Sequence, residues 1–262
     1  MTTTFLEDHR ASLRDQRPFL FRLPTPPMTL KRMADQAPNI LASLPADVHA
    51  QIPPDAVCRT ALELAARALP EPIFNHSVRV YLLAKWLAAR EGSHWAQETG
   101  LPLLFAACIC HDLGASDLYN GHQRFEVEGA DTASHHCASH GVSAGDCHKV
   151  WCAIALHTSA GIAERIDPFT RLVRVGVKLD FSPAVKEAYG AQLYASDIEL
   201  LLPRLNVEKV LADAVVAQAM KIPAVDSMTW PDSEKHPKAS WPGILLRAHL
   251  ENPGHEGVNP AF

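Results

Sequence analysis

The sequence has no surplus of positive charge. Its 262 residues contain 24 lysines and arginines against 29 aspartates and glutamates, which gives a formal net charge of −5 at pH 7. A chain without a basic field has no general electrostatic attraction for a polyphosphate backbone or an anionic lipid surface. We therefore expect neither nucleic acid nor a membrane among its partners.

Long apolar runs and export signals are also lacking. The longest apolar run, Leu101 to Cys110, has about half the length that a bilayer requires. The first residues carry acids where a signal peptide carries basic groups. None of the six cysteines forms a Cys-x-x-Cys pair, and three lie in apolar helical stretches. We expect a cytoplasmic protein with free thiols.

No stretch alternates apolar and polar residues for long enough to predict a sheet, whereas helical periodicity dominates from Pro53 onward. The fold class is therefore expected to be all-α. The expected helices span about residues 57–69, 75–90, 101–112, 126–140, 145–159, 168–181, 184–189, 196–202, 207–220 and 243–250.

Proline is concentrated at both ends of the chain, where it breaks helices. We therefore predict an N-terminal arm at residues 1–50, a helical domain at 51–222 and a C-terminal tail at 223–262 that packs on this domain. Such arms suggest a homo-oligomer. The tryptophans are expected to be packing residues, with Trp230 and Trp241 anchoring the tail.

Four side chains of metal-binding type fall on the apolar faces of three expected helices, where a buried polar group without a partner is costly. They are His76, His111, Asp112 and Asp180. His111 and Asp112 are neighbours at one helix end, so a single turn projects an imidazole and a carboxylate. Asp180 follows Gly176 by one helical turn, and this glycine would let another helix approach closely.

Each of these residues also has an ordinary structural explanation. A single histidine on an apolar face can be a core residue with satisfied hydrogen bonds. Asp180 can cap a helix or pair with Lys178 or Arg174. Taken together, however, two imidazoles and two carboxylates suit one catalytic metal ion that keeps open positions for water.

The order His76, His111-Asp112 and Asp180 resembles the H…HD…D pattern of the HD-domain superfamily, which consists of all-α, metal-dependent hydrolases with the metal in a helical bundle. Four segments are similar to signatures of the cyanamide hydratase family: FNHSVRVY (74–81), CHDLG (110–114), RFEVEGAD (124–131) and WCAIALHT (151–158). The resemblance covers roughly residues 50–220. It implies a hydro-lyase that adds water to the nitrile carbon of cyanamide, a small-molecule substrate, and gives urea.

Two departures from other members of the superfamily are informative. Many HD phosphohydrolases carry a lysine shortly after His-Asp, but the run from His111 to Ser116 contains none. Two-metal phosphodiesterases have a histidine four residues before a Gly-Ala pair, where this chain has Phe125. We therefore expect one metal ion per chain, and we place Phe125 beside the substrate.

We expect this ion to be Zn²⁺, held by His76, His111, Asp112 and Asp180. The same donors would also accept Fe²⁺, Mn²⁺, Ni²⁺ or Co²⁺. A bound divalent ion lowers the pKa of water to about 7 and so presents hydroxide at neutral pH. Asp112 is thus expected to be a catalytic residue as well as a ligand.

Further roles follow from neighbouring residues. His157, on the apolar face of the helix expected at 145–159, is predicted to move a proton, with Glu126 or Glu128 as alternatives. Both glutamates could instead cap a helix or lie on the surface. Asn75 and Thr158 are expected to bind the amino group of the substrate, and the alternative for each is a structural role.

Two other functions fit the same residues. The protein could be an HD-type phosphohydrolase that acts on a nucleotide or phosphomonoester, or a non-enzymatic binding module stabilised by metal. The histidines at 135–140, with Cys147 and His148, could imitate a structural zinc site. They lack paired spacing and fall on several helix faces, so a solvated, histidine-rich helix is the better interpretation.

Overall fold

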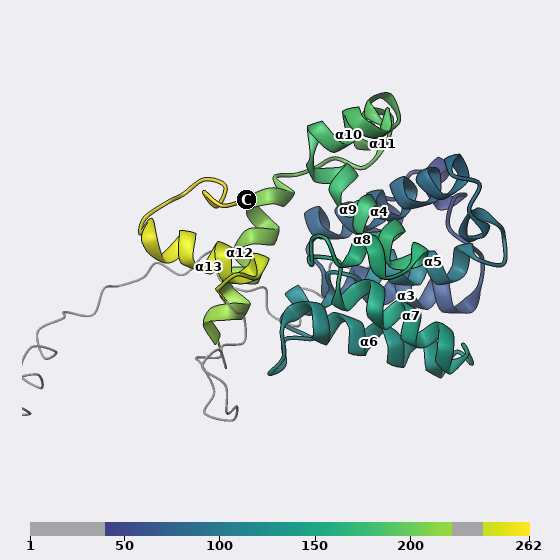
Figure 1. Ribbon diagram of the computed structural model, residues 1–262, viewed down its shortest axis with the longest axis horizontal. Helices are drawn as coiled ribbons and strands as arrows, with labels where there is room; N and C mark the ends of the chain where they lie inside the picture. The colour runs from purple at the N-terminus through teal and green to yellow at the C-terminus, as the bar shows by residue number, and fades with distance from the viewer. Residues whose placement is uncertain (1–39, 222–237) are drawn as a thin grey trace, which may run out of the picture.

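The computed structural model describes residues 40–221 and 238–262, and within these two ranges it contains helices and no strand (Figure 1). The predicted all-α fold is confirmed. None of the described helices combines the length and the apolar character needed to cross a bilayer. The helices are α2 (Ala46–His49), α3 (Ala56–Ala68), α4 (Glu71–Arg90), η1 (His94–Ala96), α5 (Leu101–Cys110), η2 (Leu113–Ala115), α6 (Phe125–Ser139), α7 (Ala144–Ala155), α8 (Ala163–Ile166), α9 (Pro168–Phe181), α10 (Pro183–Tyr189), α11 (Gln192–Leu201), α12 (Val207–Lys221) and α13 (Trp241–Glu251).

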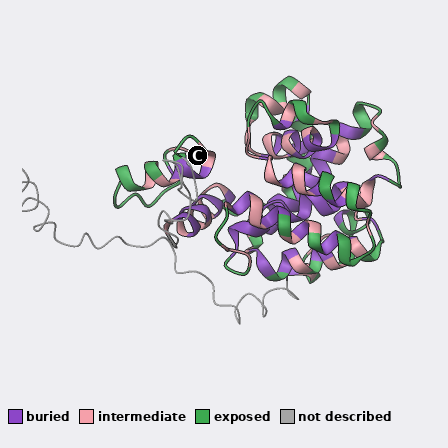
Figure 2. Ribbon diagram, turned by 60° about the horizontal axis from the view of Figure 1, so that its bottom comes forward, coloured by how far each residue is buried: buried purple, intermediate pink, exposed green. Residues whose placement is uncertain are grey.

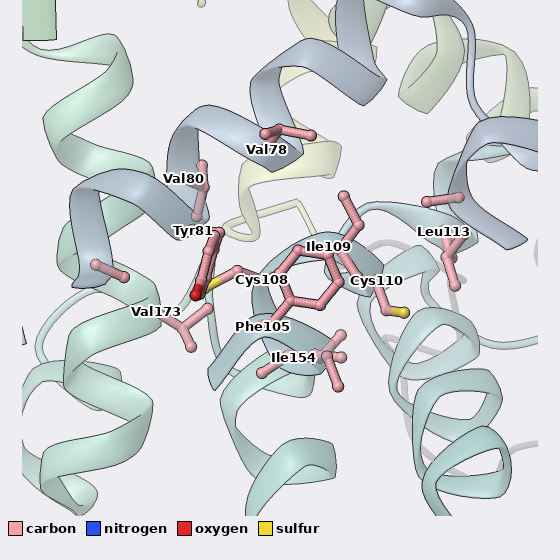
Figure 3. Close-up of a cluster of buried hydrophobic side chains, with 14 of the residues drawn as sticks. Val78, Val80, Tyr81, Phe105, Cys108, Ile109, Cys110, Leu113, Ile154 and Val173 are labelled. Carbon is pink, nitrogen blue, oxygen red and sulfur yellow. The ribbon is translucent and has the colours of Figure 1, made fainter. Parts of the chain in front are cut away.

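Helix α4 forms the centre of the bundle. Every residue from Ile73 to Ala84 is buried, so this part of the helix is covered on all sides, and its buried polar residues must find partners within the protein. Figure 2 shows that the buried residues, in purple, gather on the helix faces that point into the bundle. Tyr81 of α4 meets Phe105 of α5 edge to face, with ring centroids 4.9 Å apart (Figure 3).

Side-chain caps mark the N-termini of several helices, among them α9 and α10. The Asp167 carboxylate accepts a hydrogen bond from the Thr170 backbone N–H, and Pro168 occupies the first turn of α9. Ser182 caps α10 in the same way, and Gly190 ends that helix in the left-handed region at φ 64°. The Asp167 cap and Pro168 determine where α9 begins. Asp180, near the other end of α9, is buried in the core.

Two helices end earlier than predicted. The helix expected at 101–112 ends at Cys110, and the one expected at 145–159 ends at Ala155. His111, Asp112 and His157 therefore lie in the turns that follow α5 and α7, although all three are buried as predicted. Helix α11 begins four residues before its predicted start, and the short helices α2 and α8 were not predicted.

The end of the chain returns to the helical body. Helix α12 packs against α4. Helix α13 in turn packs against α12 (Figure 1). The Asn259 side chain donates to the Leu245 carbonyl and ties the last residues to α13. Most of the predicted arm at 1–50, the first part of the predicted tail and Trp230 lie outside the described residues.

All six cysteines carry free thiols, as predicted. Five of them are buried, and Cys152 is partly exposed. Burial disfavours a thiolate, and it raises the pKa of Cys58 and of Cys137 to about 12. These thiols behave as small apolar core residues.

Gly176 lies where α9 crosses α4. A Cβ atom at this position would stand 2.9 Å from the Val80 carbonyl oxygen and 3.2 Å from the Ala84 Cβ. The two helix backbones are therefore too close for a larger residue. The predicted close approach is confirmed, and it brings Asp180 of α9 within reach of His76 of α4.

We predict that Gly176→Ala lowers the free energy of unfolding by about 1–3 kcal/mol, because the new methyl group must push the α4 backbone away. Urea denaturation followed by circular dichroism measures this difference. Gly145→Ala is the matched control, since a Cβ there meets only the Ser143 Oγ at 4.0 Å. The control should lose no stability and can gain up to about 1 kcal/mol. Equal effects of the two substitutions would contradict the packing interpretation.

Candidate metal centre

Two histidines and an aspartate converge between α4 and the turn after α5. The Nε2 atoms of His76 and His111 lie 3.2 Å apart. Asp112 Oδ2 lies 3.2 Å from His111 Nε2 and 3.6 Å from His76 Nε2. All three residues are buried, and one ligand atom from each lies within 4.8 Å of the others. The residues form a cradle of the size that holds a single ion.

The other ring nitrogen of each histidine is already engaged. His111 Nδ1 lies 2.7 Å from the Cys108 carbonyl oxygen, and His76 Nδ1 lies 2.7 Å from Asp180 Oδ2. A carbonyl or an ionised carboxylate can only accept, so both Nδ1 atoms must carry the proton and donate. The two Nε2 atoms are therefore left to face each other, and a proton or a metal ion between them would bind both.

The convergence of these atoms is unfavourable without a cation. Asp112 Oδ2 is buried and has no hydrogen-bond partner, and it lies within 3.6 Å of both imidazole Nε2 atoms. Burial acts to lower the pKa of His111, but the Asp112 charge outweighs it and holds this pKa above its ordinary value. The site thus attracts positive charge, and a divalent ion would satisfy all three donors at once. The residues fit a metal.

His157 supplies a third imidazole at the edge of this cluster. Its Nδ1–H donates to the Ile154 carbonyl at 2.6 Å, so its Nε2 also presents a lone pair. That Nε2 lies 3.7 Å from Asp112 Oδ1, which is beyond hydrogen-bond distance. Burial and the neighbouring His111 lower the pKa of His157 to about 3, so its ring is neutral at pH 7.

The turn that carries Asp112 is held by close backbone packing. A Cβ on Gly114 would overlap the Phe125 carbonyl, and a Cβ on Gly129 would lie 3.3 Å from the His111 carbonyl oxygen. These two glycines let η2 lie directly against the start of α6. The Gln218 side chain of α12 donates to the Gly114 carbonyl and closes the turn from the other side.

Asp180 was predicted to be a metal ligand, but it lies behind His76. Its Oδ2 accepts from His76 Nδ1, and both of its oxygens accept from Arg79, at 2.7 and 2.9 Å. Although burial acts to raise it, the pKa of Asp180 lies below its ordinary value because Arg79 and His76 donate to the carboxylate. In this arrangement Asp180 orients His76 instead of joining the converging atoms.

Arg79 and Arg204 are parts of the site that the sequence interpretation missed. Arg79 is fully buried, and its Nη1 also donates to the Leu202 carbonyl. Arg204 donates to the backbone carbonyl of Asp180 at 3.0 Å. The sequence did contain a signal for Arg79, which follows His76 by three residues and so lies on the same face of an apolar helix. An arginine buried there requires a carboxylate partner, and Asp180 could have been predicted as that partner.

A cavity of about 670 Å³ opens onto the cluster. Its wall includes His76, His111, Asp112 and His157. Apolar side chains form much of the remaining wall: Ile162, Val177, Phe181, Leu211, Trp241, Ile244 and Phe262. Three basic side chains, Arg124, Arg174 and Lys178, also line it. The sequence interpretation did not assign these basic residues, Ile244 or Phe262 to the site.

Glu126, Thr158 and Arg124 form a second polar group beside the cavity. The Thr158 hydroxyl donates to Glu126 Oε1 at 2.6 Å, and Arg124 donates to the same oxygen at 2.9 Å. Glu126 is fully buried, and its Oε2 has no hydrogen-bond partner. Glu128, the alternative proton carrier, instead accepts from the Gln123 backbone N–H at 2.7 Å, which is the capping role weighed for it.

Two predicted substrate-binding residues lie elsewhere. The Asn75 side chain donates to the Pro203 carbonyl at 3.1 Å, and Asn75 is not part of the cavity wall, so it ties α4 to the loop after α11. Phe125 packs edge to face against His157, with ring centroids 5.6 Å apart. Phe125 therefore packs against the His157 ring and is not among the residues that line the cavity. Thr158 does line the cavity, as its predicted role requires.

The histidine-rich helix does not assemble a second cluster. His136 is buried with its Nε2 on the Val57 carbonyl, and His140 contacts Thr60. Within residues 40–221 and 238–262, a single group of three potential metal ligands is found, formed by His76, His111 and Asp112. His136 and His140 therefore make ordinary structural contacts and do not form a zinc site.

Comparison with known families finds an HD domain at residues 73–202. This confirms the resemblance to the HD superfamily, whose members are typically metal-dependent hydrolases that bind divalent ions. The matched range includes the metal cradle, His157 and Asp180, whereas α12, α13 and Phe262 lie beyond it. No curated protein matches the chain.

We predict that Asp180→Asn lowers the free energy of unfolding of metal-free protein by about 3–5 kcal/mol, because it leaves the buried Arg79 charge without a counterion. Chemical denaturation in the presence of a chelator measures the loss. Asp213→Asn is the matched control, since its partner Lys209 is partly exposed, and it should cost at most about 1 kcal/mol. Unchanged stability together with lost metal binding would instead identify Asp180 as a ligand.

Proposed function

We propose that this protein is a metal-dependent hydratase that adds water to a small nitrile, with cyanamide as the simplest substrate and urea as its product. The observation that carries the proposal is a metal cradle that opens into a largely apolar cavity. The two arginines in the wall of this cavity already have acidic partners. The resemblance of four segments to the cyanamide hydratase family supports the same reaction.

The residues that would hold the ion are His76, His111 and Asp112, with Asp180 fixing the orientation of His76. Three such donors leave coordination positions open, which is typical of a catalytic site. We propose Zn²⁺, which this nitrogen and oxygen donor set accepts readily. When bound, the ion would act as a Lewis acid and lower the pKa of water to about 7.

His157 is suited to move the proton. The net reaction joins the water oxygen to the nitrile carbon, removes the C≡N triple bond and transfers both water protons, which gives an amide after tautomerisation. His157 Nε2 faces the cavity with a free lone pair, so it can accept a proton from water and return it to the nitrile nitrogen. Its Nδ1–H stays bonded to the backbone throughout.

Thr158 is suited to orient the substrate. Its hydroxyl proton is committed to Glu126 Oε1, so toward the cavity the oxygen can only accept. The amino group of cyanamide is a hydrogen-bond donor and would match this oxygen. Glu126, held by Arg124 as well, fixes the direction of the hydroxyl and thus acts through Thr158.

The charges in the cavity favour a neutral substrate. Arg124 pairs with Glu126 at 2.9 Å, and Arg174 pairs with Glu164 at 3.2 Å. Arg174 also donates to the His157 carbonyl, so it supports the turn that carries His157. An approaching anion would compete with these partners for both guanidinium groups.

A second candidate function is hydrolysis of a phosphomonoester or nucleotide. Lys178 lies 3.8 Å from Glu164, the same carboxylate that pairs with Arg174. Two cations thus share one acid, which leaves this part of the wall with one positive charge in excess. That surplus is the observation that favours an anionic substrate.

We predict that protein carrying about one Zn²⁺ per chain forms urea from cyanamide, and that His157→Ala lowers kcat by roughly 10²–10⁴-fold while it retains the metal. A colorimetric urea assay coupled to elemental analysis gives both values. His148→Ala, which changes an exposed histidine, is the control and should keep full activity.

No urea from fully metal-loaded protein would rule out the hydratase. Phosphate release from a nucleotide panel by the same sample would then establish the second candidate. If chelation unfolds the protein and neither reaction occurs, the metal is structural and the protein is a binding module.

A further inference from the structure

The cavity is much larger than cyanamide. Cyanamide has three non-hydrogen atoms, and at the ~30 Å³ that one water molecule occupies in the liquid, three groups of this size fill roughly 90 Å³. The cavity of about 670 Å³ is instead in the range of sites that bind ligands of drug size. A substrate with a substantial substituent would therefore fit beside the metal cradle.

The wall that would meet such a substituent is aromatic and continuous with the cradle. The Phe181 ring lies 4.5 Å from the His76 ring and 5.1 Å from the Phe262 ring, measured between centroids. Phe262 in turn lies 5.8 Å from Trp241. These rings extend from a metal-ligand candidate to the start of α13, so an apolar group attached to the reacting carbon would pack along them.

Residues beyond the matched HD domain contribute this wall. Trp241, Ile244 and Phe262 come from the segment after residue 202, where the HD domain match ends. Ser240 caps α13 through the Gly243 backbone N–H, and α13 packs on α12, so the Trp241 ring sits on a fixed helix. The HD domain thus supplies the reacting groups, and the C-terminal segment supplies a surface for the rest of the substrate.

We propose that the preferred substrate is a nitrile with an uncharged, apolar substituent of about the size of an aromatic ring, which packs against Phe181, Trp241, Ile244 and Phe262. This inference rests on the proposed hydratase function. The reaction is R–C≡N + H₂O → R–C(=O)–NH₂: both π bonds of the nitrile and both O–H bonds of water break, while a C=O double bond and two N–H bonds form. No oxidant or reductant is required.

The first test compares cyanamide with phenylcyanamide as substrates of the metal-loaded protein. We expect kcat/KM to be about tenfold or more higher for phenylcyanamide, because the ring buries apolar surface in the cavity. In Trp241→Ala this preference should fall about tenfold. Leu250→Ala is the matched control: Leu250 is an exposed residue of the same helix outside the cavity wall, and its substitution should leave the preference unchanged.

The second test measures binding without turnover. Isothermal titration of wild-type protein with phenylurea and with urea, the two products, should show about tenfold or more tighter binding of phenylurea. This result does not depend on the folding of any variant. Equal affinities would overturn the inference.

The outcomes separate the two proposals. Urea formation from cyanamide with no preference for phenylcyanamide would overturn the inference about the substituent and leave the hydratase function intact. Failure to hydrate either compound with the metal in place would overturn both. A preference that Trp241→Ala and Leu250→Ala reduce equally would show that the wall described here does not contact the substituent.

Discussion

The site depends on where three imidazoles place their protons. His76, His111 and His157 each donate Nδ1–H away from the centre, to Asp180 or to a backbone carbonyl, so each Nε2 lone pair points inward. Asp112 adds a carboxylate oxygen that has no hydrogen-bond partner. Three imidazoles and one carboxylate in a single buried space are unfavourable without a cation. A divalent cation would bind these donors and remove the repulsion between them. The surrounding fold serves to hold these groups in place.

Close backbone approach provides that support. Gly176 lets α9 cross α4, which sets Asp180 against His76, and Gly114 with Gly129 lets the turn after α5 lie on α6. Asp180 then needs its own counterion, and the buried Arg79 supplies it. The metal-ligand candidates are thus oriented by an outer layer of charged and backbone groups, an arrangement that fixes ligand geometry in metal sites.

The sequence predicted the fold and the cradle because both depend on local periodicity. A histidine on an apolar helix face must point inward, and that was sufficient for His76. His111 and Asp112 lie in the turn after α5 and not on its face, although both are buried as predicted. Contacts between distant segments were not predictable in this way. The role of Asp180 depended on Arg79, Asn75 was held by the Pro203 carbonyl, and the aromatic wall came from a segment interpreted only as a tail. The identity of the metal, a cytoplasmic location and a homo-oligomer stay predictions.

Nitrogen-15 NMR of the imidazole rings tests the central claim most directly, because it reports which nitrogen carries the proton. The structure predicts that His76 and His157 are Nδ1–H tautomers in metal-free protein, with His111 retaining its Nδ1 proton. One equivalent of Zn²⁺ should shift the Nε2 signals of His76 and His111 and leave their Nδ1–H groups protonated. Nε2–H tautomers, or Nε2 signals that do not respond to the ion, would contradict the account.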